Sequence, residues 1–528
     1  MKKVNPWSQK SYLLKAEVKR LRPNTLFHIV YICFIGFMSL YIYRPMRELD
    51  FFWRIILGDS LISNSEIASN NLSTWGDYDK VWKTTQPMGE ILLSRIYKLG
   101  GLELISVSRI LVWVFFVCWV YRLLFTQKGF QKVSMYMQFM ITIYGLTSVF
   151  LLLPFIQERP QTILLILLAI VGSNLAEVFM NSVANVKTST WLILAVSVWI
   201  HPAWVIIYSL VFFHIAKCAF ERKKKKLREY VLLLVIPVLP ILGPSGANYY
   251  LNLIEISRLG RLFISEWQPL WKMNLSQPIL FLFGIQLVLI ILLSFGLAKT
   301  LSSTEHILFL AFLLLLQIFA AVSLRNLPIA IILSISWLGV VIVFNNKRRD
   351  EFENLNLENT VQKVSNIENV PNIFKAIPLF FLLFSLSISI GHSFKATEDF
   401  TRVAPIKIIE AMSKLRFAKV INSSNEGGYI HYFGSVTVFP FIDGRIDRFN
   451  ISQIDSLDSL FSSETGTKDL KRREFSQATE ILIPRDKPLR PVPKSGFRFV
   501  CQENGYLWYS RQSDASCSKS RDETNRIR

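Results

Sequence analysis

The chain has 528 residues, of which 51% are hydrophobic, and its formal net charge at pH 7 is +21. Several apolar runs reach the roughly 20 residues that a helix needs to cross a hydrocarbon core about 30 Å thick, which predicts a membrane protein. The positive charges lie mainly beside these runs, with no accompanying nucleic-acid-binding fold, and this distribution argues against a nucleic-acid partner.

Eleven apolar runs are predicted to cross the membrane as helices, within a transmembrane domain at 26–391. They lie at about 26–43, 104–125, 133–153, 160–180, 189–200, 203–220, 229–243, 278–299, 305–323, 327–345 and 374–391. The first run follows a basic segment, residues 1–25, and lacks a small-residue cleavage site, so we expect a retained helix. His201-Pro202 separates the fifth run from the sixth, because proline removes a backbone donor and disfavours helix just before itself.

The distribution of Lys and Arg predicts which side each loop faces. Basic clusters at 222–226 and 347–349 flank apolar runs, and such an excess is typical of cytoplasmic loops. We therefore expect the N-terminus and a linker at 346–373 in the cytoplasm, and the loop at 44–103 on the other side of the membrane. An odd number of spans places the C-terminal region outside as well. If the fifth and sixth runs formed one span, the cluster at 222–226 would face outward, which the charge rule disfavours.

The regions outside the predicted spans have secondary-structure patterns of their own. In the loop at 44–103, Asp50 to Ile62 and Met88 to Leu99 have the spacing of amphipathic helices lying on the outer interface. The pattern of helix and strand signals at 392–512 predicts a small α/β domain, and the composition of 513–528 predicts a polar tail. The expected elements are a helix at 406–416, a turn at 426–428, and strands at 418–421, 436–442, 480–483, 497–501 and 506–510, the last two in a hairpin.

The five cysteines show no metal-ligand spacing. Cys501 and Cys517 share the predicted outer domain, and an oxidising compartment would permit a disulfide between them. The sequence leaves open whether that bond forms.

Two carboxylates follow the first predicted span. Asp50 lies among aromatic residues at the membrane surface, where it suits a general base or a divalent-ion ligand, or where it pairs with Arg47 or Arg54. Glu90 follows Pro87, which suits a helix start, and a Glu in the first turn also simply opposes the helix dipole.

Cations and an imidazole mark the other predicted outer ends. Arg159, before Pro160, suits either a bound phosphate or an anchor in the lipid headgroups. His201 interrupts an apolar stretch, either as a functional group or as a satisfied structural histidine. Glu266-Trp267 follows Arg258 and Arg261 in an outer loop, and Arg325-Asn326 begins the tenth span. A lipid-linked phosphate donor needs such cations to stabilise its leaving group.

In the C-terminal region, Asp443-Gly444-Arg445 ends a predicted strand. Taken alone, this motif is an ordinary turn signal.

Taken in order, these motifs resemble a family of bacterial polytopic proteins in the C-type (GT-C) glycosyltransferase superfamily, related to protein O-mannosyltransferases and lipid A aminoarabinose transferases. The resemblance covers nearly the whole chain. It runs through Asp50-Phe51-Phe52-Trp53, Gly58, Gly89-Glu90, Leu99-Gly100-Gly101-Leu102, Arg159-Pro160-Gln161, His201-Pro202, Gly243-Pro244-Ser245-Gly246, Glu266-Trp267-Gln268-Pro269, Arg325-Asn326, Gly427-Gly428-Tyr429, Asp443-Gly444-Arg445 and Leu482-Ile483-Pro484-Arg485-Asp486.

This resemblance implies a polyprenyl-phosphate sugar donor, an acceptor reached from the outer leaflet, and Asp50 as the catalytic base. Such enzymes generally invert the anomeric carbon, and some members use a divalent metal such as Mg²⁺ or Mn²⁺. The chain departs from the family where relatives carry His, here Arg54, and where they carry a later acid, here Asn70. Thr85-Gln86-Pro87-Met88 also replaces a His-Glu-Trp-Leu stretch. These losses weaken the case for a metal and for full activity, unless Asp77 and Asp79 substitute.

Three functions compete on this evidence. The first is an extracytoplasmic glycosyltransferase using a lipid-linked sugar, and the second is a non-catalytic protein of envelope polysaccharide assembly that binds lipid carriers and membrane lipids. A transporter or flippase is the third, and it is disfavoured because ionisable residues concentrate at the outer ends of the spans rather than at the midplane. An enzyme predicts that Asp50, Arg159, His201, Glu266 and Arg325 converge on one outward cavity.

Overall fold

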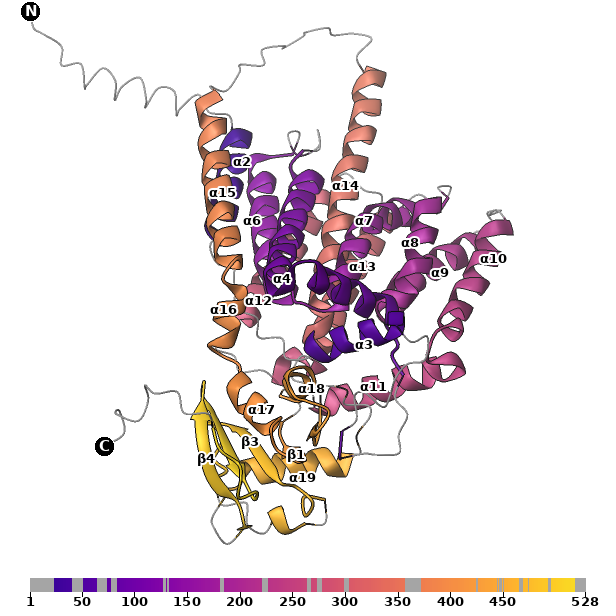
Figure 1. Cartoon of the computed structure of the whole chain (residues 1–528). Helices are drawn as coiled ribbons and strands as arrows, with labels where there is room; N and C mark the ends of the chain where they lie inside the picture. Colours follow the sequence, from indigo (N-terminus) through magenta and orange to yellow (C-terminus); the bar gives the residue numbers. More distant parts are fainter. Residues whose placement is uncertain are drawn as a thin grey trace, which may run out of the picture.

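The chain folds into a bundle of apolar helices with a smaller α/β domain at one end, as Figure 1 shows. The structure, a computed structural model, describes residues 23–39, 51–63, 74–76, 83–126, 130, 133–180, 185–220, 227–263, 267–272, 278–298, 303–356, 372–423, 426–443, 445, 449, 451–464, 469–472, 474–491 and 495–517.

Each apolar run predicted from the sequence coincides with a helix. These helices are α2 (Pro23–Ser39), α4 (Pro87–Leu124), α6 (Met135–Leu152), α7 (Pro160–Met180), α8 (Thr188–Ile200), α9 (Trp204–Phe220), α10 (Leu227–Val235) with the 3-10 helix η3 (Ile236–Leu242), α12 (Pro278–Ala298), α13 (Ser303–Val322), α14 (Leu327–Asn356) and α15 (Asn372–Ser393). Within the described residues, five helices are long and apolar enough to cross a membrane, or six if a bent pair at 227–262 is one span. The number of crossings stays a prediction.

Proline and glycine set the ends of several helices. α4 and α7 begin at Pro87 and Pro160, where the missing backbone N–H has no helical partner to lose. α8 ends at Ile200 and α9 begins at Trp204, so the predicted break at His201-Pro202 is confirmed. α4 joins the predicted amphipathic helix to the following apolar run. The break between them lies at Gly100 and Gly101. Gly101 has a φ of +61°, a conformation that favours glycine.

Shorter helices surround the bundle. They are η2 (Leu153–Phe155), α3 (Phe51–Ser63), η4 (Gly246–Asn248), α11 (Tyr249–Phe263), η6 (Leu270–Lys272), η7 (Leu324–Asn326) and α16 (Ala396–Thr401). α3 corresponds to the first amphipathic helix predicted in the outer loop. α14 extends to Asn356, so its helix continues into the segment that the sequence assigned to a linker.

The α/β domain contains a mixed sheet of five strands in the order β2-β1-β3-β5-β4. β1 (Ala418–Ile421) pairs in parallel with β2 (Val438–Pro440) and β3 (Glu480–Pro484), whereas β5 (Tyr506–Ser510) is antiparallel to β3 and β4 (Arg498–Glu503). All five predicted strands are therefore present, and the β4–β5 hairpin is confirmed. A disulfide joins Cys501 to Cys517.

Helices cover both faces of this sheet because successive strand residues point to opposite sides. Val420, Leu482 and Trp508 pack with α17 (Ile406–Met412) and α18 (Gly427–Phe433). Ile421, Ile481 and Leu507 pack with α19 (Ile451–Ser462) on the other face, near the 3-10 helix η9 (Asp469–Lys471). The turn predicted at 426–428 is wrong, because α18 begins there: Tyr429 and Ile430 are buried in the core.

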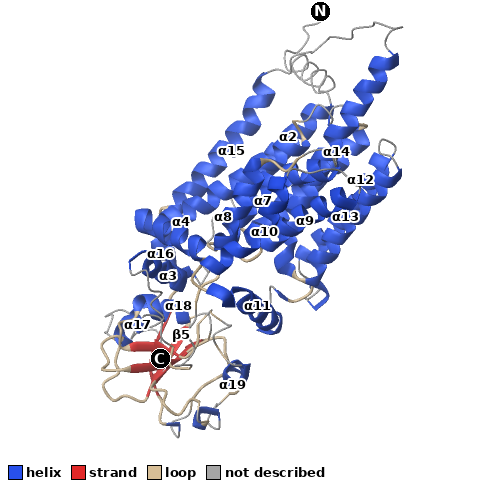
Figure 2. Cartoon of the chain, turned by 90° about the vertical axis from the view of Figure 1, so that its right-hand side faces the viewer, coloured by secondary structure: helices blue, strands red, loops and turns tan. Residues whose placement is uncertain are grey.

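The domain is joined to the bundle through α18, which lies between the bundle and the sheet in Figures 1 and 2. The ring of Phe52 on α3 packs against the rings of Tyr429, Tyr432 and Phe433. The Tyr432 hydroxyl donates to that of Tyr97 on α4 at 3.0 Å. This aromatic contact fixes the end of the bundle that carries the predicted site.

A tryptophan from the loop at 44–103 forms a second link. Trp75 is 4% exposed and belongs to the core of the α/β domain. Its backbone N–H donates to Pro440 O at 3.0 Å, and its indole Nε1–H donates to Val420 O at 3.1 Å. The outer loop is thereby attached to β1 and β2.

Candidate functional site

Three helix ends meet at one point, at the bundle end nearer the α/β domain. Gly89, in the first turn of α4, allows the approach: a Cβ there would lie 2.5 Å from Pro160 Cβ and 2.6 Å from Ile200 O. The start of α7 and the end of α8 therefore lie against the start of α4. Glu90, Arg159 and His201 each adjoin one of these contact residues in the sequence.

Glu90 is fully buried and pairs with a cation from α3. Its Oε1 lies 3.8 Å from Nη1 of Arg54, whose guanidinium carbon lies 4.4 Å from the centre of the Trp53 ring. Gly58 brings the two helices together, since a Cβ there would lie 2.3 Å from Glu90 O. The charge of Arg445, from the α/β domain, also acts on Glu90.

His201 lies between α8 and α9 as a buried, neutral ring. The backbone N–H of Ala203 donates to its Nδ1 at 3.1 Å. Burial lowers the pKa of His201 well below its usual value, and the positive charges of Arg325, Arg54 and Arg159 lower it further. A neutral imidazole accepts at one ring nitrogen and donates from the other, so the tautomer decides whether its second nitrogen also accepts.

Arg325 completes the group from the turn before α14. Its Nη2 lies 3.3 Å from Nε2 of His201, and its guanidinium carbon lies 4.8 Å from the centre of the Trp267 ring. The backbone N–H of Leu324 donates to Gln268 O at 3.2 Å, which ties the Arg325 turn to the segment after Trp267. Guanidinium stacking on an indole is a favourable cation–π contact that orients the cation.

A buried ion pair supports the segment that carries Arg159. Nη1 of Arg109, on α4, lies 2.8 Å from Oε1 of Glu158, and both side chains are less than a tenth exposed. Glu158 directly precedes Arg159 in the sequence. Its pairing with Arg109 holds the start of the Arg159 segment against α4.

The predicted residues thus converge as far as the structure describes them. Glu90, Arg159, His201, Trp267 and Arg325 lie in one group, with Arg54 added. Asp50 and Glu266 lie outside the described residues, as do Asn70, Asp77 and Asp79. The sequence predicts Arg54 as a departure from the family pattern and as a pairing partner of Asp50, whereas the structure places it beside Glu90.

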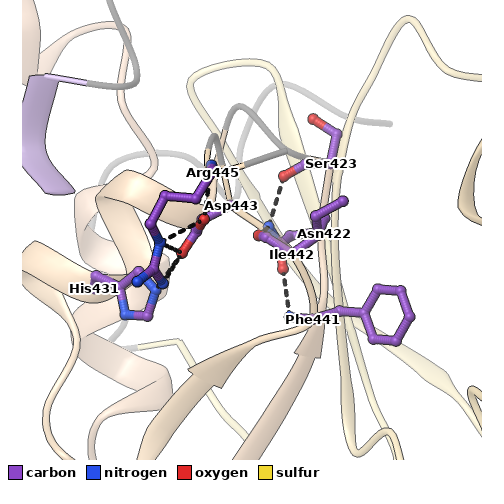
Figure 3. Close-up of polar contacts among 7 residues, drawn as sticks. All are labelled: Asn422, Ser423, His431, Phe441, Ile442, Asp443 and Arg445. Atoms are coloured by element: carbon purple, nitrogen blue, oxygen red, sulfur yellow. Dashed lines mark hydrogen bonds and ion pairs between the residues drawn. The ribbon is translucent and has the colours of Figure 1, made fainter. Parts of the chain in front are cut away.

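Asp443 and Arg445 form a second charged group, drawn in Figure 3. Nε of Arg445 donates to both carboxylate oxygens of Asp443, at 3.0 and 2.9 Å, and Nε2 of His431 lies 3.0 Å from Oδ2. Burial by itself raises the pKa of Asp443, but Arg445 and His431 outweigh it and hold that pKa well below its usual range. The motif is a buried ion pair rather than a simple turn, and His431 was not anticipated.

Asn422, at the end of β1, fixes the strand end from which Asp443 extends. Its Nδ2 donates to Ile442 O at 2.7 Å, and its Oδ1 accepts from the backbone N–H of Phe441 at 2.9 Å. Phe441 in turn packs edge-on against Trp75, with ring centres 4.8 Å apart. The charged group therefore lies directly beside the contact with the outer loop.

The described part of the site does not fit a divalent metal. No three His, Cys, Asp or Glu side chains among the described residues lie close enough together to hold one. Beside Glu90 and His201, the group contributes the guanidinium charges of Arg54, Arg159 and Arg325. Three like charges would repel a divalent cation, whereas they would attract an anion.

No family model matches the chain, and no curated protein matches it. Several solved structures do. The chain is similar to the oligosaccharyltransferase of Archaeoglobus fulgidus in the apo form, at 12% identity and a TM-score of 0.42, over 93% of this chain and 75% of that one. It is similar to AglB of that organism in complex with an inhibitory peptide and a dolichol-phosphate, at 11% identity and a TM-score of 0.40, over 92% and 74%. For ArnT from Cupriavidus metallidurans bound to undecaprenyl phosphate, the identity is 13% and the TM-score 0.41, over 94% and 99%.

Proposed function

We propose that the chain is a membrane glycosyltransferase of the C-type class. It transfers a sugar from a polyprenyl-phosphate-linked donor to an envelope glycan, lipid or protein on the extracytoplasmic side of a bacterial plasma membrane. In this proposal the chain crosses the membrane eleven times, with its N-terminus in the cytoplasm and the α/β domain outside.

One observation carries the proposal: the guanidinium groups of Arg54, Arg159 and Arg325 all act on one buried imidazole, that of His201. Nη2 of Arg325 lies 3.3 Å from Nε2 of His201, and the Trp267 ring orients the same guanidinium group. An anionic oxygen beside this group of arginines would accept hydrogen bonds from them. With the charges of Arg54 and Arg159 nearby, a phosphate is the fitting ligand.

The reaction is a single displacement at the anomeric carbon. The acceptor hydroxyl attacks that carbon while the bond from carbon to the phosphate oxygen breaks, and Asp50 takes the hydroxyl proton. The departing polyprenyl phosphate gains negative charge, which Arg159, Arg325 and His201 stabilise. Arg54 and Glu90 hold each other in place beside this group.

The test uses the full chain in nanodiscs, with radiolabelled polyprenyl-phosphate sugars and with undecaprenyl phosphate as a binding probe. Asp50→Asn should abolish transfer yet retain undecaprenyl phosphate, whereas Arg325→Ala should weaken its retention at least tenfold. Arg416→Gln, an exposed position in the α/β domain, is the control and should change neither. Full retention in the Arg325→Ala variant would refute the assigned phosphate site.

A second candidate is a non-catalytic protein that binds lipid carriers. The departures from the family pattern at Arg54 and Asn70 favour it. This candidate predicts undecaprenyl phosphate binding without sugar transfer in both the native chain and the Asp50→Asn variant.

A further inference from the structure

α11 runs across the end of the bundle. The chain bends by 115° between the helical segments Leu227–Leu242 and Gly246–Leu262. In Figures 1 and 2, α11 lies between the bundle and the level of the α/β domain, crosswise to the bundle helices in Figure 1. α11 thus follows an apolar helical segment and turns away from its axis.

One face of α11 is exposed and combines apolar with basic side chains. Leu251, Ile254 and Leu262 are 65%, 67% and 57% exposed, and Arg258 and Arg261 are exposed beside them. The spacing of these positions puts them on one side of an α-helix. Large apolar groups interleaved with arginines on one face are typical of helices that lie in the membrane interface.

The segment that precedes α11 also exposes large apolar side chains. Leu227 and Leu234 on α10 and Leu242 at the end of η3 are 78%, 75% and 73% exposed. Helices that cross a bilayer expose such residues to acyl chains. Exposed leucines therefore occur on both sides of the bend.

We propose that α11 lies in the bilayer leaflet on the side of the α/β domain. Leu251, Ile254 and Leu262 insert among the acyl chains, while Arg258 and Arg261 bind the phosphates of anionic phospholipids. This placement goes beyond the proposed sugar transfer and does not depend on it.

The opposite face of α11 contacts the site. The Tyr249 hydroxyl accepts from the indole Nε1–H of Trp204 at 3.0 Å, three residues after His201. Gly260 lies under the Trp267 ring, where a Cβ would be 2.8 Å from the nearest ring carbon. Since Trp267 stacks on Arg325, α11 transmits its position in the leaflet to the Arg325 side chain.

Spin-label accessibility tests this placement. The full chain would carry a nitroxide at Ile254→Cys, with Cys33, Cys118 and Cys218 replaced by serine and the disulfide retained. Val288→Cys on α12, 56% exposed, calibrates the acyl region, and Val436→Cys in the α/β domain, 91% exposed, calibrates water. In nanodiscs, the label at 254 should collide with oxygen as often as the label at 288. It should be shielded from a water-soluble nickel chelate. Nickel accessibility equal to that at 436 would overturn the proposal. This exposed face would then be open to water and available to a protein partner.

The arginines have a separate test that does not need a label. Arg258→Gln/Arg261→Gln should retain phosphatidylglycerol at least fivefold less than the native chain, measured as copurified lipid by native mass spectrometry. Lys414→Gln/Arg416→Gln removes the same charge from exposed positions of the α/β domain and should retain it fully. Equal retention in both double variants would remove the lipid-phosphate role of α11.

Discussion

Asp443→Asn removes the charge at the centre of the buried group in the α/β domain. Asp443 is fully buried and Arg445 is 2% exposed, so the substitution leaves a guanidinium out of water without its counter-ion. Removing one partner of a buried ion pair costs about 3–5 kcal/mol. Asp443 extends from the strand end that Asn422 holds. We therefore expect the substitution to lower the free energy of local opening of β1 and β2 by this amount.

Hydrogen exchange measured by mass spectrometry on the full chain reports that opening locally. Since about 1.4 kcal/mol is a factor of ten, the slowest amides of β1 should exchange on the order of 100- to 3,000-fold faster in Asp443→Asn. Asp455→Asn, an exposed position on α19, is the matched control and should change exchange by less than about threefold. If the two variants exchange alike, Asp443 does not stabilise the domain.

The pH dependence of this effect has a definite sign. The folded pKa of Asp443 is held well below its usual range, so its contribution is complete above the unfolded value of about 3.9 and is lost as pH falls towards the folded pKa. The difference in unfolding temperature between the native chain and Asp443→Asn should shrink below about pH 4. A difference that grows in acid would contradict the assignment.

Two further predictions concern Gly89 and Glu480. Gly89→Ala should separate the starts of α4 and α7, lower stability by about 1–3 kcal/mol and weaken retention of undecaprenyl phosphate. Gly284→Ala on α12, where a Cβ meets no atom within 4 Å, should do neither, as thermal unfolding and copurified lipid would show. Burial raises the pKa of Glu480 to about 7. The contribution of its protonated carboxyl to the free energy of unfolding is therefore complete below the pKa of Glu480 in the unfolded chain, and it is lost as pH rises through about 7. Thermal unfolding of the α/β domain between pH 5 and 8 should lose this dependence in Glu480→Gln, and unchanged slopes would refute the cause.

The sequence by itself located most of the helices and strands. Apolar runs and prolines located the bundle helices, including the break at His201-Pro202, and residue alternation located all five strands of the α/β domain. These are local properties, because backbone sterics and side-chain periodicity act over a few residues. The same local reasoning failed at 426–428, where packing of Tyr429 and Ile430 stabilises a helix in a glycine-rich segment.

Only the tertiary structure decided which charged groups meet. Arg54 and Glu90 lie on different helices, His201 and Arg325 are 124 residues apart, and Trp75 contacts Val420 across 345 residues. No local pattern encodes such pairs, since they depend on how helix and strand faces pack and on glycines such as Gly58 and Gly89 that permit close approach. The motifs indicated one end of the bundle, and packing determined that arginines surround Glu90 and His201 there.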